Sequence, residues 1–375
     1  MCRRRVLERA GDLITSCKVL MGSDFRRLIY WPAIGQAISN EAPGRNLNRE
    51  ETLAKSDFPK SVHIKEEGPR EGFQFEKGHI PTERKIELID ALSKTGLKTI
   101  QIVSFVHPKL VPGQADAEAV VAGITPEPGV TYAGLWLNER GYERAIAAGR
   151  VDLNGGLNHS TSEKFLKRNQ NRTMDEQTGR QHVLCEMYKG AGAGLDRATL
   201  MGTFGCNFEG DVPVERVVEL VKLMLDIAAE HKLEVPRVQL ADTMAWGTPL
   251  TIKRVVGALQ DRFPDQTLAL HLHDTRGMGI ANAYAGIEMG VEHFDGSVAG
   301  LGGCPFAGHT GAAGNVCTED LVFMFHEMGI DTGIDLEALI ECARLAEDIV
   351  GHPLPGSVMK GRSLKHLREK IGQPA

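Results

Sequence analysis

From Ser61 to about residue 328, short apolar runs alternate with longer amphipathic segments, and this alternation constrains the fold more than any other feature of the chain. Such a pattern is typical of repeated strand–helix units around a parallel sheet. The expected strands are 61–67, 99–105, 131–137, 150–156, 198–204, 237–242, 268–273 and 293–299. The expected helices are 82–95, 115–123, 139–148, 173–189, 213–231, 249–262, 279–289 and 317–328.

Eight strands, each followed by a helix, match a closed (β/α)8 barrel, which usually takes roughly 250 residues. An open doubly wound sheet would carry a glycine-rich phosphate-binding motif after its first strand, and none follows residues 61–67. The sequence therefore predicts an α/β fold of the (β/α)8 TIM-barrel type.

Three segments follow from this pattern. Residues 1–27 are rich in arginine and residues 39–60 are polar, and we expect residues 1–60 to be an N-terminal extension that is poorly structured or arm-like. Residues 61–345 form the predicted catalytic barrel, and residues 346–375 form a C-terminal helical tail. A helix is expected over 335–350, across this boundary.

Composition excludes several classes of protein and of partner. Hydrophobic residues make up 42% and charged residues 25% of the 375 residues, as in a globular protein with a real core. The net charge of −6 argues against a nucleic-acid or membrane-surface partner, and no apolar run reaches the length of a membrane span. Seven cysteines without a CxxC pair indicate reduced thiols, so we expect a cytoplasmic location, or a mitochondrial one if the chain is eukaryotic.

Two histidines end the expected seventh strand. His271 and His273 stand two residues apart, so their side chains point to the same face, here the barrel interior. Catalytic groups of such barrels lie at the carboxyl ends of the strands. Two convergent imidazoles at that end indicate a divalent-metal site rather than a pair of structural histidines.

Further candidate ligands follow the first and last strands. Glu71 could supply a carboxylate oxygen, and Asn315 an amide oxygen, unless Asn315 only caps the next helix. A set of nitrogen and oxygen ligands favours Mg²⁺ or Mn²⁺ over a structural zinc. Such an ion could polarise an alkoxide together with a carbonyl, as in making or breaking a carbon–carbon bond.

Two more residues have a context suited to catalysis. Arg70 could offer forked donors to an oxygen that becomes negative, unless Arg70 and Glu71 form only a surface ion pair. Cys304 begins a glycine-rich stretch typical of a loop that moves, and it could exchange a proton when that loop closes.

At these positions the chain resembles 3-hydroxy-3-methylglutaryl-CoA lyase, within the metal-dependent lyase and acyl-transfer barrel superfamily that includes the isopropylmalate synthases. The resemblance covers roughly residues 61–345, and its most specific part surrounds Cys304. The similar runs are residues 68–74, 104–109, 240–243, 271–275 and 297–305.

The resemblance implies cleavage of a β-hydroxy-β-methyl acyl-CoA to acetyl-CoA and a keto acid such as acetoacetate. Residues at the family's positions would then act as metal ligands (Glu71, His271, His273 and Asn315) or in catalysis (Arg70, His271 and Cys304). The implied substrate-binding residues are Gln74, Lys77, Gln101, Ser104, Asn169 and Arg276. We further expect a homo-oligomer, a dimer or larger.

The chain departs from the family's pattern near the expected substrate. Glu71 replaces an aspartate, Gln101 replaces a glutamate, and Arg276 replaces a tyrosine. These changes motivate a hypothesis of a larger or more polar β-hydroxyacyl-CoA substrate. A condensing synthase or aldolase of the same superfamily and a non-catalytic barrel that serves as a binding protein are the alternatives.

Overall fold

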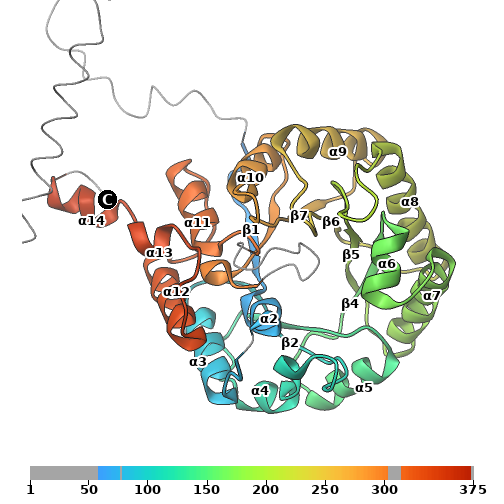
Figure 1. Cartoon of the computed structure of the whole chain (residues 1–375), viewed down its shortest axis with the longest axis horizontal. Helices are drawn as coiled ribbons and strands as arrows, with labels where there is room; N and C mark the ends of the chain where they lie inside the picture. The colour runs from blue at the N-terminus through green and yellow to red at the C-terminus, as the bar shows by residue number, and fades with distance from the viewer. Residues whose placement is uncertain (1–57, 77, 303–313, 373–375) are drawn as a thin grey trace, which may run out of the picture. The chain divides into compact units, whose positions relative to one another are not determined.

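A computed structural model describes residues 58–76, 78–302 and 314–372. Within these ranges, eight parallel strands form one sheet in the order β3-β2-β1-β8-β7-β6-β5-β4. The strands are β1 (His63–Glu66), β2 (Thr99–Ser104), β3 (Thr131–Leu135), β4 (Gly155–Ser160), β5 (Leu195–Met201), β6 (Val238–Ala241), β7 (Leu268–His271) and β8 (His293–Gly296). The sheet curls into the predicted barrel, with helices on its outer side (Figure 1).

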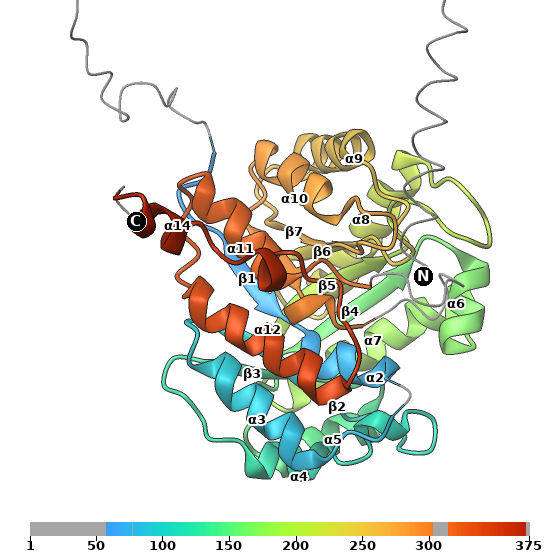
Figure 2. The same ribbon diagram turned by 60° about the vertical axis from the view of Figure 1, so that its left-hand side comes forward.

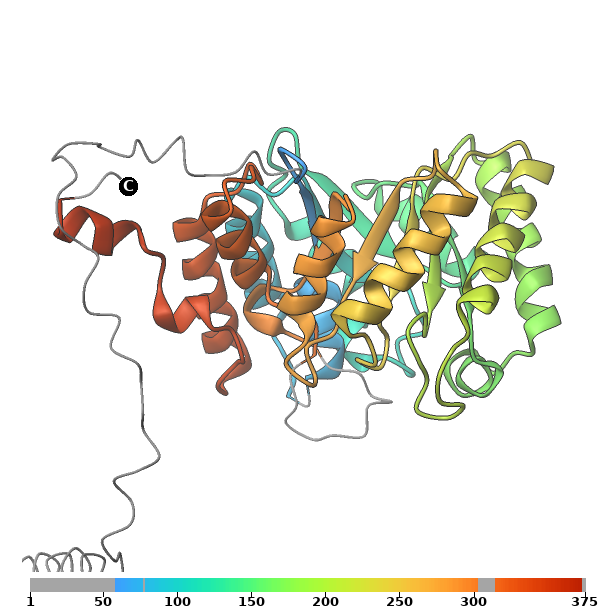
Figure 3. The same ribbon diagram turned by 90° about the horizontal axis from the view of Figure 1, so that it is seen from above.

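The helices follow the strands as the sequence pattern predicts. The longer ones are α3 (Thr82–Ser93), α4 (Ala117–Gly123), α5 (Glu139–Ala148), α6 (Glu163–Gln170), α7 (Met174–Gly190), α8 (Val214–Glu230), α9 (Pro249–Arg262), α10 (Gly279–Glu288), α11 (Thr318–Glu327) and α12 (Leu336–Val350). Short elements are η2 (Gly68–Gly72), α2 (Phe73–Phe75), η3 (Pro112–Gln114), η4 (Val298–Gly300), α13 (Val358–Gly361) and α14 (Lys365–Lys370). Figure 3 shows the barrel from another side, with the C-terminal helices (red) at one end and α7 and α8 (green) at the other.

Local sequence signals set several helix ends. Asn138 accepts a hydrogen bond from the Gly141 amide at the start of α5, and Gly149 ends that helix in the left-handed region at φ 74°. Thr173 and Glu176 form a capping box at the start of α7. These caps satisfy backbone groups that the helices themselves leave unpaired.

The main apolar core lies between the sheet and the helices. Alternate strand residues such as Ile100, Leu200, Leu240 and Leu270 are fully buried there. Helix α12 packs against α3 and α11 (Figure 2) and against η4 after β8. The predicted barrel–tail boundary at residue 345 falls within α12 and stays a prediction, and the predicted extension lies almost wholly outside the described residues.

The prediction for the fourth strand was wrong by about five residues. The strand runs over 155–160 instead of 150–156, and in the described chain a bridge from Ala133 to Asp152 joins the segment before it to β3. Its two glycines and its polar residues lack the apolar alternation that marks a strand, because one of its faces lines a polar interior. Only glycine fits at position 155, at the start of β4, since an added Cβ would lie 1.9 Å from the ring of Tyr188 on α7.

The fifth strand begins three residues before the predicted range, at Leu195. Helix α6 was not predicted, because it is short and polar and starts only two residues after the end of β4. The side chain of Ser162 caps it by accepting from the Phe165 amide.

Candidate metal-dependent active site

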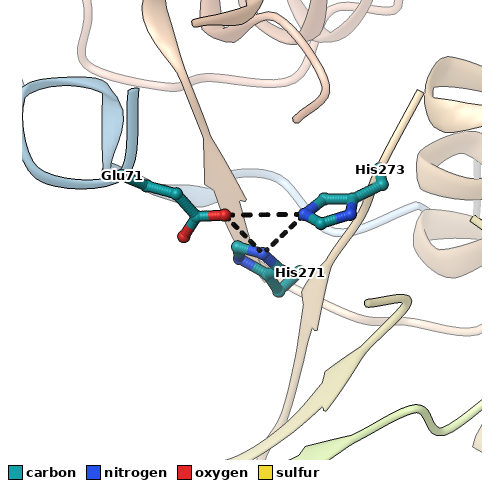
Figure 4. A group of neighbouring side chains, drawn as sticks. All are labelled: Glu71, His271 and His273. Atoms are coloured by element: carbon teal, nitrogen blue, oxygen red, sulfur yellow. Dashed lines mark hydrogen bonds and ion pairs between the residues drawn. The ribbon is translucent and has the colours of Figure 1, made fainter. Parts of the chain in front are cut away.

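The carboxyl ends of β7 and β1 bring a carboxylate and two imidazoles together (Figure 4). The Nε2 atoms of His271 and His273 lie 3.3 Å apart. The Glu71 Oε1 atom lies 3.6 Å from the His273 Nε2 and 3.9 Å from the His271 Nε2. These three ligand atoms surround one point, as the sequence predicts.

The turn η2 fixes Glu71 in this position. Gly68 and Gly72 are needed because an added Cβ would lie 2.6 Å from the Glu66 Oε1 and 2.5 Å from the Leu301 Cβ. The buried Glu66 carboxylate accepts from the backbone amides of Gly68 at 2.7 Å and Val298 at 2.9 Å. These two hydrogen bonds connect η2 to the segment after β8. Burial raises the pKa of the Glu66 carboxyl to about 7.

Asn315 completes the set. Its Nδ2 atom donates to the Glu71 Oε1 at 3.2 Å, and a backbone bridge pairs Asn315 with His273. Its Oδ1 atom is buried and has no hydrogen-bond partner among the described residues. A buried amide oxygen normally has a partner, so this atom fits a ligand that the protein itself does not supply.

The four side chains therefore fit a divalent cation. Their nitrogen and oxygen atoms are the ligand types of Mg²⁺, Mn²⁺ and related ions. Burial opposes charge on Glu71, but the Arg70 guanidinium and the two histidines outweigh it and hold the pKa of this carboxyl well below its usual range. Glu71 is thus a carboxylate at neutral pH, the form that binds a cation.

Asp295 of β8 orients the His271 ring. Its Oδ2 atom lies 3.1 Å from the His271 Nδ1, and because a carboxylate accepts, Nδ1 donates to it while Nε2 faces Glu71 and His273. This arrangement is common behind metal-binding histidines. The sequence analysis missed Asp295.

We expect Asp295→Asn to lower both the affinity for Mn²⁺ and the turnover by about 10- to 100-fold, because the ring loses its charged acceptor. Titration calorimetry with Mn²⁺ measures the first and steady-state kinetics the second. Asp261→Asn, at an exposed position, is the matched control. Unchanged Mn²⁺ affinity in the Asp295 variant would remove this role.

Arg70 is held beside the cluster of Glu71, His271 and His273, the candidate metal-binding group. Its Nη2 atom lies 2.7 Å from the Glu67 Oε2 and 3.0 Å from the Glu71 Oε2, and its Nε atom donates to Gln101. The Arg70 side chain is only 12% exposed, so this is not the surface ion pair of the alternative interpretation. A guanidinium fixed in this way can face a developing negative charge without reorganising.

Arg197, Lys65, Glu67 and Asp295 form a buried network of ion pairs in the barrel interior, next to Arg70. Arg197 donates to the Glu67 Oε1 at 3.1 Å and to the Asp295 Oδ2 at 3.4 Å. Lys65 lies 3.6 Å from the Glu67 Oε1. Arg197 thus contacts both the partner of Arg70 and the partner of His271, and the sequence analysis did not single it out.

A cavity of about 730 Å³ opens over this site. Glu71, His271 and His273 line it, and so do three predicted substrate-binding residues, Gln74, Gln101 and Asn169.

The other predicted substrate-binding residues lie elsewhere. Ser104 is fully buried and does not line the cavity. Arg276 also lies outside the lining, and its Nη1 atom donates at 2.9 Å to the carbonyl oxygens of Met244 and Ala245. Lys77 and the predicted catalytic Cys304 are outside the described residues. Substrate contact by any of these four stays a prediction.

A (β/α)8 barrel that gathers two imidazoles and a carboxylate at its carboxyl end, with the Asn315 amide beside them, has the architecture of a divalent-metal enzyme. The HMGL-like family model matches residues 61–346, and the chain belongs to this family.

Individual relatives agree with this assignment. The chain is 42% identical over 305 residues to a hydroxymethylglutaryl-CoA lyase of Bacillus subtilis, a match that covers 80% of this chain and 96% of the relative. It is 40% identical over 290 residues to the mitochondrial hydroxymethylglutaryl-CoA lyase of Bos taurus, covering 77% and 86%. A solved HMG-CoA lyase of Acinetobacter baumannii, in complex with coenzyme A and 3-methylmalate, aligns with a TM-score of 0.73 and 37% identity over 81% of this chain and 96% of that one.

Proposed function

We propose that the protein is a divalent-metal-dependent carbon–carbon lyase. It cleaves 3-hydroxy-3-methylglutaryl-CoA, or a closely similar acyl-CoA, to acetyl-CoA and a keto acid such as acetoacetate. The observation that carries this proposal is the group formed by Glu71, His271 and His273, with the unpartnered Asn315 oxygen behind it and Arg70 beside it, in a member of the HMGL-like family.

Cleavage moves one proton and one electron pair. The tertiary hydroxyl at C3 loses its proton, its oxygen becomes a ketone, and the C2–C3 bond breaks. The bonding electrons pass to C2 and the thioester oxygen as an enolate, and protonation of C2 then gives acetyl-CoA.

The residues of the chain divide these tasks. Glu71, His271, His273 and Asn315 would hold the cation, which when bound favours loss of the hydroxyl proton and orients the substrate oxygens. Arg70 donates hydrogen bonds to the thioester oxygen as it becomes negative. Proton transfer by Cys304 and His271 rests on the family resemblance alone.

The acyl-CoA substrate is supported by the Acinetobacter relative, which carries coenzyme A. No helix of the described residues is both long and apolar enough to cross a membrane. The relatives include bacterial and mitochondrial proteins, so the cytoplasmic location, the mitochondrial alternative and the homo-oligomer all stay predictions.

Removal of the ion tests the proposal. We expect chelation followed by desalting to abolish acetyl-CoA release from 3-hydroxy-3-methylglutaryl-CoA, and added Mn²⁺ or Mg²⁺ to restore it, because Glu71 and the histidines then regain their ion. Product detection by mass spectrometry checks both steps, and circular dichroism confirms that the chelated protein stays folded.

Two outcomes would overturn the proposal. Full release after complete chelation would exclude a metal-dependent lyase. Absence of release from a protein that binds the ion would favour a binding protein, or a synthase if the reverse condensation of keto acids is observed instead.

A further inference from the structure

The cavity does not end at the metal-binding group but continues down the barrel interior. Its lining includes Thr99 and Thr131, the first residues of β2 and β3. The register of the sheet relates these residues to the metal-binding group. His271 of β7 lies opposite Asp295 of β8, and Asp295 lies opposite Lys65 of β1. Lys65 lies opposite Thr99 of β2, which lies opposite Thr131 of β3. Because barrel strands tilt by about 36° and lie about 4.8 Å apart, these four steps descend about 11 Å along the barrel axis.

Small side chains keep this lower compartment open. Barrel interiors are normally filled by layers of bulky branched residues. Here the inner faces of β2 to β5 carry Thr99, Thr131, Ala133, Gly156 and Thr199, all of which line the cavity. An added Cβ at Gly156 would meet only the Arg197 carbonyl oxygen, at 3.6 Å, so the compartment has free space beside this strand.

The rest of the lining is polar and internally paired. It includes Gln101 of β2, Gln239 of β6, and the charged residues Lys65, Glu67, Asp196, Arg197 and Arg237. Arg237 is bonded to Asp196, and Arg197 to Glu67. Lys65 also lies beside Glu67, so each of these cations has a carboxylate partner and the lining presents hydrogen-bonding atoms next to paired charges.

The volume exceeds what a branched six-carbon acyl group needs. The 3-hydroxy-3-methylglutaryl group has about ten non-hydrogen atoms, which fill about 300 Å³ even at the share of a liquid water molecule for each atom. The cavity holds about 730 Å³, a volume that also includes its mouth beside Leu110, Leu137 and Asn138. With the pantetheine arm of CoA at the mouth, the part of the acyl group that becomes the keto acid would point toward the lower compartment.

We propose that this lower compartment binds an extended, hydroxyl-bearing substituent at C3 of a 3-hydroxyglutaryl-type CoA thioester. This inference rests on the proposed lyase function and names its substrate class. A neutral polar chain suits the compartment, because the hydroxyls of Thr99 and Thr131 can pair with it, whereas Thr199 already bonds to Gln239 and Gln101 accepts from Arg70. A purely apolar chain would leave the Thr99 and Thr131 hydroxyls unpaired.

Three thioesters test the inference on the metal-loaded protein. They carry methyl, 4-hydroxybutyl or pentyl at C3, and the last two are nearly equal in size. We expect kcat/KM for the 4-hydroxybutyl substrate to equal or exceed that for the methyl substrate, and to exceed that for the pentyl substrate at least about tenfold, the cost of an unpaired buried polar group.

Thr199→Phe supplies the structural test, because the ring would fill the compartment below the metal-binding group. We expect at least about a tenfold loss of kcat/KM for the 4-hydroxybutyl substrate and less than about a threefold change for the methyl substrate. Ala133→Leu fills the same space from β3 and replaces the first variant if that one does not fold. Thr125→Phe, at an exposed position outside the cavity lining, is the matched control.

The outcomes separate the two proposals. Preference for the methyl substrate, unaffected by Thr199→Phe, would overturn the inference and leave the lyase function standing. Equal or faster cleavage of the pentyl substrate would overturn the polar substrate class. Failure to cleave any of the three with metal present would overturn the lyase function and the inference with it.

Discussion

His273→Ala is expected to abolish the binding of Mn²⁺ and the cleavage of the acyl-CoA together. The ring supplies one of the three ligand atoms that face a common point, and its Nε2 lies 3.6 Å from the Glu71 carboxylate. A cation that polarises a substrate oxygen contributes several kcal/mol, so a loss of about 4 kcal/mol lowers kcat/KM about a thousandfold. Titration calorimetry and electron paramagnetic resonance with Mn²⁺ measure binding independently of turnover.

The matched control is His326→Ala, near the end of α11, which removes an imidazole that bonds to Thr332 outside the site. It should retain Mn²⁺ binding and turnover. Retained Mn²⁺ binding in the His273 variant, or turnover close to that of the unchanged protein, would refute the metal-site assignment.

The sequence was sufficient to predict the barrel and the meeting of Glu71, His271 and His273 at its carboxyl end, because both depend on short-range patterns. Strand–helix alternation specifies the fold class, and the spacing of His271 and His273 specifies that both rings face the interior. The position of Glu71 followed from its place directly after the first strand. The structure brings these side chains together as predicted.

Residues that act through barrel closure could not be predicted in the same way. Asp295 precedes the last residue of a short strand, and nothing near it in the sequence marks it as the partner of His271, 24 positions earlier. Arg197 lies on β5 and reaches Glu67 across 130 positions. Both residues lie on the inner face of a strand, so a period-two search for charged residues on otherwise apolar strands could have found them.

The polar interior also explains where the strand boundaries were misplaced. Methods based on apolar alternation assume that an inner face is apolar, but the β4 residues that line the cavity are two glycines, a leucine and an asparagine, namely Gly155, Gly156, Leu157 and Asn158. Glycine and asparagine have low strand propensity, and only their pairing with β5 makes them a strand. Small and polar residues stand in β4 where barrel strands usually carry bulky ones. They made the strand hard to predict, and they also leave space for the compartment below the metal-binding group.

Arg70→Met is expected to lower kcat about 100- to 1000-fold with little change in KM, because the guanidinium stabilises charge that develops only in the transition state. The affinity for Mn²⁺ should not fall. Arg70 lies 3.0 Å from the Glu71 carboxylate, so its removal takes away a charge that repels the cation, while His271 and His273 still favour the ionised form of Glu71. This separates Arg70 from His273, whose loss is expected to reduce both quantities.

Arg70→Lys sharpens the test, since lysine keeps the charge but not the planar fork that contacts Glu67, Glu71 and Gln101 at once. We expect it to recover only part of the lost kcat. Arg254→Met, at an exposed position on α9, controls for removal of a guanidinium. A large rise in KM with kcat unchanged in Arg70→Met would instead make Arg70 a ground-state binding residue, because an interaction lost equally from substrate and transition state changes KM alone.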